Sequence, residues 1–270
     1  MKITFLVDNK TESTLCNAEW GLSVLIETGR KMILMDQGAS PMLIENAEKM
    51  DIDLSRVDFA TVSHGHCDHT GGTMAFFDVN EKAKVYIHKD ALHSFFVPGE
   101  IGNVGVPWSG DFIKNNADRI VFTEGVHSVD RDVWLIGNVP RMEGFSPTET
   151  FYLKIDDEIL PDPMKHEQAL VIEDGGKLHI FSGCSHQGIV PILIYIGGLF
   201  PWKKISTVVA GMHLYSAGEE LIDKVIDEME ALGVERIFPV HCTGMRAIVR
   251  FKMRLGDKVN VAAAGESYEF

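Results

Sequence analysis

A short histidine-rich segment directly follows an apolar run, and this combination limits what the chain can fold into. Residues 63–72 read Ser-His-Gly-His-Cys-Asp-His-Thr-Gly-Gly, with three histidines and an aspartate within six positions. Imidazole nitrogen and carboxylate oxygen are ligands that suit zinc and its divalent neighbours. The apolar residues 57–62 predict a buried strand, and α/β sheets place their chemistry at the carboxyl ends of strands. We therefore expect a metal site, and the alternative of a solvated histidine-rich loop fits this setting poorly.

The length and charge of the chain narrow the class of partner. Its 270 residues suffice for one large domain or two smaller ones, and 45% hydrophobic residues with 24% charged residues are typical of a globular protein. The formal net charge of −14 opposes binding to nucleic acid and to anionic membrane surfaces, and no basic patch offsets it. We expect a small-molecule substrate, no nucleic acid and no membrane partner. The chain could also form a homo-oligomer, and the sequence leaves this open.

The cysteines and the apolar segments point to the cytoplasm. Cys16, Cys67, Cys184 and Cys242 are widely spaced without a Cys-x-x-Cys pair, so a disulfide framework is not expected. The first apolar run is too short for the core of a signal peptide. The longest one, residues 188–202, falls short of the roughly 20 residues that span a membrane. It predicts a buried helix followed by a loop, with a wall of the active site or a dimer contact as its functional alternative.

Hydrophobic periodicity predicts α/β structure in both halves of the chain, around a looser middle region. Residues 89–163 form short segments broken by glycine and proline, and we expect this loop-rich insertion to act as a lid or specificity region. The predicted strands lie at 2–7, 22–27, 31–35, 57–62, 84–88, 169–173, 178–181, 205–210 and 236–240. Helices are predicted at 40–50, 73–77 and 218–232, after residue 186 and after residue 240.

Four further histidines lie near predicted strands, where metal chemistry could use them. His186, His213 and His241 each follow a short apolar strand, so they can converge with His64 at one end of the sheet assembly. His166 instead precedes a predicted strand. A single histidine in such a place is more often a satisfied core or surface residue. Three in the same setting, beside a metal loop, favour ligation.

The chain resembles the metallo-β-lactamase superfamily over essentially its whole length. The motif His64-x-His66-x-Asp68-His69, the upstream Asp36-Gln37-Gly38 and the later His241 carry this resemblance. More specifically, residues 63–72, 182–186, 211–214 and 241–244 resemble the branch of 7,8-dihydropterin-6-yl-methyl-4-(β-D-ribofuranosyl)aminobenzene 5′-phosphate synthase-like proteins. The resemblance implies an α/β fold, a four-layer αββα metallo-β-lactamase sandwich, as a single domain over residues 1–270 with an irregular middle insertion.

The resemblance also implies a set of metal ligands. It gives His64 and His66 to a first metal, and Asp68 and His69 to a second, which His241 completes. One or two divalent ions are therefore expected, with Zn²⁺ favoured and iron or manganese as alternatives.

Two positions depart from the superfamily pattern. The usual third histidine precedes the strand predicted at 169–173, where its place falls near Asp162 or Pro163, and we favour His186 over His166 as the substitute ligand. The usual bridging aspartate falls at Cys184. A thiolate there can bind zinc, while a small buried core cysteine is the alternative.

The leading functional prediction is a metal-dependent hydrolase. A metal-bound hydroxide, from a water with its pKa lowered to about 7, would attack a small anionic substrate such as a phosphoester, lactone or thioester. Asp68 would orient the water or take its proton, and His213 would donate a hydrogen bond to developing negative charge. Arg141 would hold an anionic part of the substrate, with a solvated loop arginine as the alternative.

Two other functions stay open. The branch name implies a synthase that acts on a pterin or aminobenzoate-like compound. A non-catalytic, metal-dependent small-molecule binding protein belongs to a different class. Structural zinc sites tend to be closed and thiolate-rich, whereas this loop is rich in histidine and carboxylate, and this difference favours catalysis.

Overall fold

The strands predicted in the two halves of the chain build separate sheets, each within its own unit of the structure. The computed structural model describes residues 1–97, 102–145 and 149–270. Unit 1 comprises residues 1–123, 150–166 and 263–270, and unit 2 comprises residues 124–149 and 167–262. The expected insertion at 89–163 is thus shared between the units, and parts of it (98–101 and 146–148) lie outside the described residues. A single domain over 1–270 and a lid role for 89–163 stay predictions.

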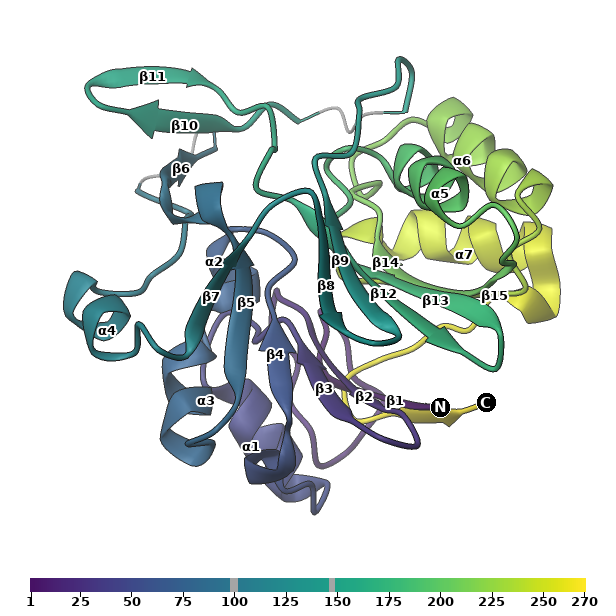
Figure 1. Cartoon of the computed structure of the whole chain (residues 1–270). Coiled ribbons are helices and arrows are strands. Elements are labelled where there is room, and N and C mark those ends of the chain that lie inside the picture. The colour runs from purple at the N-terminus through teal and green to yellow at the C-terminus, as the bar shows by residue number, and fades with distance from the viewer. Residues whose placement is uncertain (98–101, 146–148) are drawn as a thin grey trace. The chain divides into compact units, whose positions relative to one another are not determined.

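Unit 1 is built on a seven-stranded sheet in which the two ends of the chain meet. The strand order is β16-β1-β2-β3-β4-β5-β7, antiparallel from β16 to β3 and parallel from β3 to β7. Pairing of β1 with β16 brings both termini together (Figure 1). The strands are β1 (Lys2–Val7), β2 (Ser23–Glu27), β3 (Met32–Met35), β4 (Phe59–Thr61), β5 (Lys84–His88), β7 (Ile120–Thr123) and β16 (Ser267–Glu269).

Helices α1 (Met42–Lys49) and α3 (Thr73–Val79) cover one face of this sheet (Figure 1). Helix α1 begins at Met42, with Pro41 rather than Ser40 at the N-cap position, and the Ser40 hydroxyl accepts a hydrogen bond from the Met42 nitrogen (3.2 Å). Leu43 and Phe76 are fully buried in one core with Val62. Burial of each such side chain contributes about 1.5–3 kcal/mol to the stability of the fold. The packed core in turn holds the strand ends from which the histidine loop departs. The shorter helices are η1 (Leu54–Arg56), α2 (Cys67–Thr70), η2 (Lys89–Leu92) and α4 (Gly110–Asn115).

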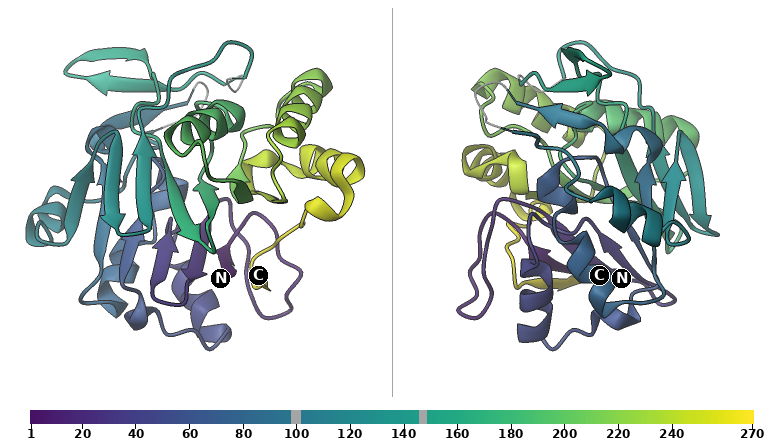
Figure 2. Two further views of the ribbon diagram at one scale, coloured as in Figure 1. Left: turned by 45° about the vertical axis from the view of Figure 1, so that its right-hand side comes forward. Right: turned by 90° about the vertical axis from the view of Figure 1, so that its left-hand side faces the viewer.

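A small three-stranded sheet, which the sequence did not predict, completes unit 1. Its order is β11-β10-β6, with β6 (Ser94–Phe96), β10 (Tyr152–Ile155) and β11 (Glu158–Pro161). The β10–β11 hairpin stands apart from the seven-stranded sheet (Figure 2). Ile155 and Ile159 are exposed, so these short strands lack the alternation of buried and exposed residues that reveals a strand in a sequence.

Unit 2 is built on a six-stranded sheet with the order β15-β14-β13-β12-β9-β8. The strands from β13 to β15 are parallel and the others antiparallel, so three neighbouring strands end at the same edge. The bounds are β8 (Val126–Asp130), β9 (Val133–Gly137), β12 (Gln168–Asp174), β13 (Lys177–Ser182), β14 (Ile205–Gly211) and β15 (Arg236–Val240). The strands predicted at 169–173, 178–181, 205–210 and 236–240 are confirmed.

Three helices pack on this sheet around the core of unit 2 (Figure 1): α5 (Ile189–Leu199), α6 (Glu219–Ala231) and α7 (Met245–Leu255). The periodicity of α6 predicted its buried face, on which Ile222, Ile226 and Met229 lie. The longest apolar run is the expected buried helix, followed by a turn. Two short helices, η3 (His241–Thr243) and η4 (Gly256–Lys258), complete the unit. Within the described residues, no helix combines the length and apolar character needed to cross a membrane.

Candidate functional site

Asp36 is the residue around which the histidine loop of unit 1 is arranged. It directly follows β3, is fully buried, and has a φ of 56°, which is costly for a residue other than glycine. Its Oδ1 accepts a hydrogen bond from the Ser63 backbone nitrogen (2.7 Å). Its Oδ2 accepts from Ser63 Oγ (2.7 Å) and from His69 Nδ1 (2.6 Å). Because β3 and β4 are parallel neighbours, their ends bring this carboxylate to the loop.

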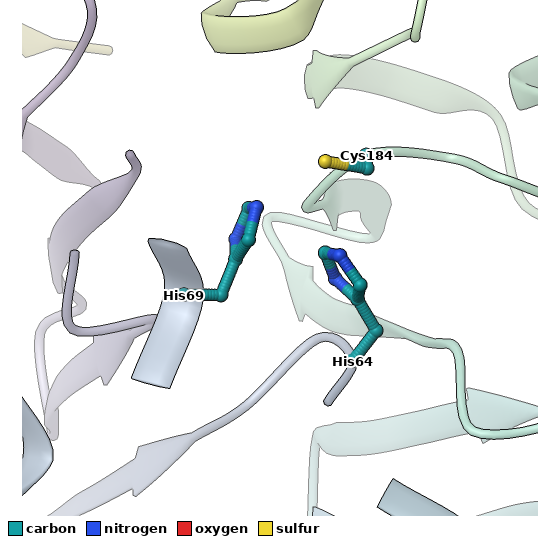
Figure 3. Close-up of side chains that lie close together, drawn as sticks. All are labelled: His64, His69 and Cys184. Carbon is teal, nitrogen blue, oxygen red and sulfur yellow. The ribbon is translucent and has the colours of Figure 1, made fainter. Parts of the chain in front are cut away.

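Hydrogen bonds to the same carboxylate, directly from His69 and through Ser63 from His64, fix the two imidazole rings. Ser63 Oγ donates its hydrogen bond to Asp36, so His64 Nδ1, which lies 2.9 Å from that oxygen, donates to Ser63 Oγ. His69 Nδ1 donates to Asp36 directly. In both rings Nε2 then carries the lone pair that a metal needs. Figure 3 shows the two side chains next to each other, with 4.2 Å between the ring centroids.

The four predicted ligands of unit 1 form two close pairs. His64 Nε2 accepts a hydrogen bond from His66 Nδ1 (3.0 Å), and His69 Nε2 lies 3.7 Å from Asp68 Oδ2. Zinc bonds of about 2.0–2.2 Å place two ligands of one ion roughly 3–3.5 Å apart, which is close to both separations. The three histidines are buried, but the side chain of Asp68 is 17% exposed. Solvent therefore reaches this cluster at the aspartate.

His166 supports the histidine loop through both of its ring nitrogens. Its Nδ1 accepts from the Gly65 backbone nitrogen (2.9 Å), and its Nε2 donates to Asp162 Oδ2 (2.9 Å). Burial would raise the pKa of Asp162, yet the hydrogen bond and charge of His166 hold it below its usual value. His66, Asp162 and His166 also have the spacing of a metal site. The two hydrogen bonds occupy both nitrogens of His166, so this residue supports the loop rather than offering a ligand atom.

Gly65 makes the close approach of this loop to its surroundings feasible. A Cβ atom at this position would lie 2.3 Å from the Ala91 carbonyl oxygen. A side chain would therefore displace the loop between His64 and His66, which explains why a glycine separates the two histidines.

The surroundings of His66 keep its imidazole neutral. The ring stacks on Phe151, with 4.7 Å between centroids, and is 5.7 Å from the Phe95 ring. Burial first, and then the neighbouring charge of His166, lower the pKa of His66 to about 3. A neutral imidazole is the form that binds metal, so the ring needs no deprotonation near neutral pH.

This lowered pKa makes the stability of the metal-free protein depend on pH. Between about pH 6.5 and pH 3 the unfolded chain protonates His66 while the folded chain does not, so acid favours unfolding. We expect this one group to reduce the free energy of unfolding by about 1.4 kcal/mol per pH unit across that window. Denaturant unfolding between pH 7 and 4 should show a shallower dependence in His66→Gln than in the wild type. His93→Gln, at an exposed histidine, should retain the wild-type slope; equal slopes in all three would contradict this account.

Three neighbouring strands of unit 2 end in residues with an unusual backbone conformation. Ser185 follows β13 with a φ of 55°, His213 follows β14 with 49°, and His241 follows β15 with 48°. A residue other than glycine pays about 1–3 kcal/mol for such a conformation, and these residues cluster at functional sites. Because the three strands are parallel neighbours, their ends share one edge of the sheet. The sequence predicted this shared edge for His186, His213 and His241.

One cluster at this edge contains two cysteines. Potential ligand atoms of Cys184, His241 and Cys242 lie within 4.8 Å of one another, and all three residues are buried. Burial opposes ionisation of Cys242, but its hydrogen bond to Cys184 and the charge of His241 lower the pKa to about 6. Figure 3 includes Cys184, which lies on the loop after β13. That Cys184, His186 and His241 share a metal centre with the histidines of unit 1 stays a prediction.

A second cluster at the same edge surrounds His213. Its ring lies 4.6 Å from that of His186 and 5.3 Å from that of Tyr215, centroid to centroid. His213 Nε2 is 3.7 Å from Glu149 Oε2, and the Tyr215 hydroxyl donates to the same carboxylate. Burial, followed by the effect of Glu149, raises the pKa of Tyr215, so this hydroxyl stays a proton donor. The predicted catalytic His213 therefore lies among groups that can exchange hydrogen bonds with a substrate.

Arg141 lies close to the loop that carries His186. Its Nε donates to Gln187 Oε1 (3.3 Å), and its side chain is exposed. Glu167 holds this loop, because its two oxygens accept from the backbone nitrogens of His186 (2.5 Å) and Gln187 (2.8 Å). The role of Arg141 as an anion contact stays a prediction.

The donor set of unit 1 fits a divalent metal ion. It consists of imidazoles and a carboxylate, and a buried carboxylate orients the rings from behind, as is usual for ligating histidines. Its two pairs, His64 with His66 and Asp68 with His69, contain no thiolate, in contrast to the thiolate-rich donor sets of many closed structural zinc sites.

Sequence reasoning missed several residues that organise these clusters. Asp36 and Cys242 were noted only within motifs, Cys242 also as a widely spaced cysteine, and neither was given a role. Asp36 directly follows the strand predicted at 31–35, and Cys242 is the second residue after the strand predicted at 236–240, so the strand-end argument applied to the histidines would have found both. Glu149, Glu167 and Tyr215 gave no comparable signal, because the folding of distant segments sets their contacts.

Comparison with known proteins gives a consistent result. The family model of the metallo-β-lactamase superfamily matches residues 21–199. The 7,8-dihydropterin-6-methyl-4-(β-D-ribofuranosyl)-aminobenzene-5′-phosphate synthase of Methanocaldococcus jannaschii is 29% identical over 271 residues, covering 94% of this chain and 90% of the relative. An uncharacterized protein of the same organism is 28% identical over 253 residues, covering 92% and 93%. The crystal structure of Tm1679, a metal-dependent hydrolase of the β-lactamase superfamily, is 30% identical with a TM-score of 0.87 and covers 100% and 99% of the two chains.

Proposed function

Because the chain belongs to the metallo-β-lactamase superfamily and has its fold, we propose that it is a metal-dependent hydrolase of a small anionic substrate. The observation that carries this proposal is the pairing of His64 with His66 and of Asp68 with His69, oriented through Asp36. The similarity to Tm1679, which is described as a metal-dependent hydrolase, supports it.

The residues of unit 1 have distinct roles in this proposal. His64, His66, Asp68 and His69 would hold one or two divalent ions, with Zn²⁺ favoured. Such an ion supplies Lewis-acid polarisation of the scissile group and a water whose pKa is lowered to about 7. Asp68, the partly exposed member, would orient that water or accept its proton. Asp36 would keep the Nε2 atoms of His64 and His69 aimed at the ligand position.

Two residues of unit 2 would act on the substrate. His213 would donate a hydrogen bond to negative charge that develops during the reaction, with Glu149 and Tyr215 positioning its ring. Arg141 is exposed, and its guanidinium group would bind an anionic part of the substrate.

A second candidate function is a synthase acting on a pterin or aminobenzoate-like compound. The relative that carries a synthase name matches nearly the whole chain at 29% identity, and this similarity favours the second candidate. Both candidates use the same metal ligands, so they differ in the substrate rather than in the ligand set.

A substrate screen separates the two candidates. Metal-free protein would be reconstituted with Zn²⁺ and assayed against phosphomonoesters, phosphodiesters, lactones and thioesters, and in parallel against pterin precursors with aminobenzoate-like acceptors. We expect turnover of at least one ester class that disappears on chelation and returns with Zn²⁺.

Asp68→Asn is the matched variant for this screen, because it keeps the shape of the side chain but removes its basicity. It should lower turnover of the ester substrate by about 10²–10⁴-fold, the usual contribution of a general base. Turnover restricted to the pterin arm would replace the hydrolase by the synthase. Bound metal without turnover in either arm would favour a binding protein.

A further inference from the structure

The small sheet of unit 1 presents a row of apolar side chains on one of its faces. In the registers of β6, β10 and β11, Leu153 lies opposite both Phe95 and Leu160. Directly opposite residues of neighbouring strands point to the same face, so the three side chains form one apolar row across the sheet. Phe95 is fully buried, Leu153 is 7% exposed and Leu160 is 41% exposed. The row therefore runs from the interior of the unit to a partly open edge.

A cavity of about 380 Å³ lies against this row. All of its lining residues belong to unit 1, and none is among the four metal ligands proposed for that unit. Its volume is at the lower end of the roughly 300–1,000 Å³ of small-molecule sites, so it suits a single ring or a short branched chain rather than a nucleotide. The small sheet, η2 and the segment after β11 line it, with Asp90, Phe95, Leu153, Leu160, Asp162 and Lys165 among the lining residues.

Two groups of opposite charge at the cavity can reach a ligand. Lys165 is exposed, and it forms no ion pair within the parts of the chain that the structure describes. The side chain of Asp90 is 36% exposed, and the imidazole nitrogen nearest to it, His88 Nδ1 at 4.0 Å, accepts the Asp90 backbone N–H and so carries no proton. The carboxylate of Asp162 is buried and already accepts two hydrogen bonds from its own segment. A ligand therefore meets one ammonium group and one carboxylate beside the apolar row.

We propose that this cavity binds a small zwitterion, an α-amino acid with an apolar or aromatic side chain. The side chain of the ligand packs on the apolar row, its carboxylate pairs with Lys165, and its ammonium group pairs with Asp90. The inference goes beyond the proposed hydrolase, because the cavity uses none of the four proposed metal ligands and needs neither a metal ion nor turnover.

Titration of the intact protein with phenylalanine, phenylacetate and phenethylamine tests this assignment. The three probes share an aromatic ring, but phenylacetate lacks the ammonium group and phenethylamine lacks the carboxylate. We expect phenylalanine to cause saturable shifts of the backbone amide resonances of Leu153, Leu160 and Lys165 in ¹⁵N–¹H spectra. Each of the other two probes should bind about tenfold more weakly, because one charged contact is lost.

Two pairs of variants locate the ligand. Leu160→Glu puts a charge at the open end of the apolar row and should weaken phenylalanine binding at least tenfold. Ile159→Glu puts the same charge on the opposite face of β11, outside the cavity, and should leave binding unchanged. Lys165→Met should reduce the affinity for phenylalanine to that for phenethylamine, without weakening phenethylamine binding. Lys154→Met, at an exposed lysine outside the cavity, is its control.

Several outcomes would overturn the proposal. Shifts confined to residues 63–72 would place the probe at the histidine loop instead, and the absence of shifts at the cavity would remove the site. Equal affinities for the three probes would show that neither charge contributes, and equal effects within a variant pair would place the ligand elsewhere. The comparison of probes on the wild type covers the case in which a cavity variant does not fold. Binding is followed without turnover, so its failure is distinct from failure of the proposed hydrolase.

Discussion

His66→Ala is expected to lose bound metal and to hydrolyse the substrate found in the screen about a thousandfold more slowly than the wild type. Removal of the ring leaves His64 Nε2 without the nitrogen that lies 3.0 Å away, so one pair of ligands is reduced to a single imidazole. Lewis-acid polarisation contributes several kcal/mol to a hydrolytic transition state, and a loss of about 4 kcal/mol corresponds to a factor of roughly 10³. Metal analysis and initial rates measure the two effects.

His93→Ala is the control for this variant, because it removes an exposed histidine of the same unit. It should keep both metal content and rate. Circular dichroism and the unfolding midpoint show whether His66→Ala, which also loses its stacking on Phe151, remains folded. A folded His66→Ala protein with unchanged metal content and undiminished hydrolysis would refute the assignment of His66.

The second large effect is expected at Asp36, which touches no substrate in this account. Asp36→Asn retains the size of the side chain, and asparagine tolerates the φ of 56° better than alanine would. The amide nitrogen cannot accept the hydrogen bonds that Oδ2 accepts from Ser63 and His69. Loss of such a supporting carboxylate typically weakens metal binding by about 10–100-fold. Competition with a chromophoric chelator measures this change.

A positioning role predicts a specific pattern for Asp36→Asn. At saturating metal the rate should largely recover, whereas His66→Ala should stay inactive, because only the second variant lacks a ligand. Asp58→Asn is a suitable control: its carboxylate accepts from the Met32 nitrogen (2.9 Å), outside the histidine loop. Wild-type metal affinity in Asp36→Asn, or equal losses in both aspartate variants, would show that the hydrogen bonds of Asp36 do not orient the ligands.

The parts of this protein that could be predicted from sequence are those governed by local patterns. Apolar runs and their spacing predicted β1, β5, β15 and α6 close to their observed bounds. The histidine loop was found because its ligands are consecutive in the chain and follow a buried strand. The likeness of its motif to the metallo-β-lactamase superfamily gave the fold, which the family comparison confirms.

The rest depends on contacts between distant segments. The support of Gly65 by His166 joins residues 101 positions apart, and no local pattern encodes it. The small sheet of β6, β10 and β11 was missed because its strands are short and partly exposed.

The most direct test of the central claim is a titration of the metal-free wild-type protein with Zn²⁺, in which bound metal and hydrolysis of the substrate identified by the screen are followed together. The account predicts negligible hydrolysis without metal and a rate that rises in proportion to the ions bound by His64, His66, Asp68 and His69. Full hydrolysis by the metal-free protein would contradict it, as would saturation with Zn²⁺ without any gain in rate.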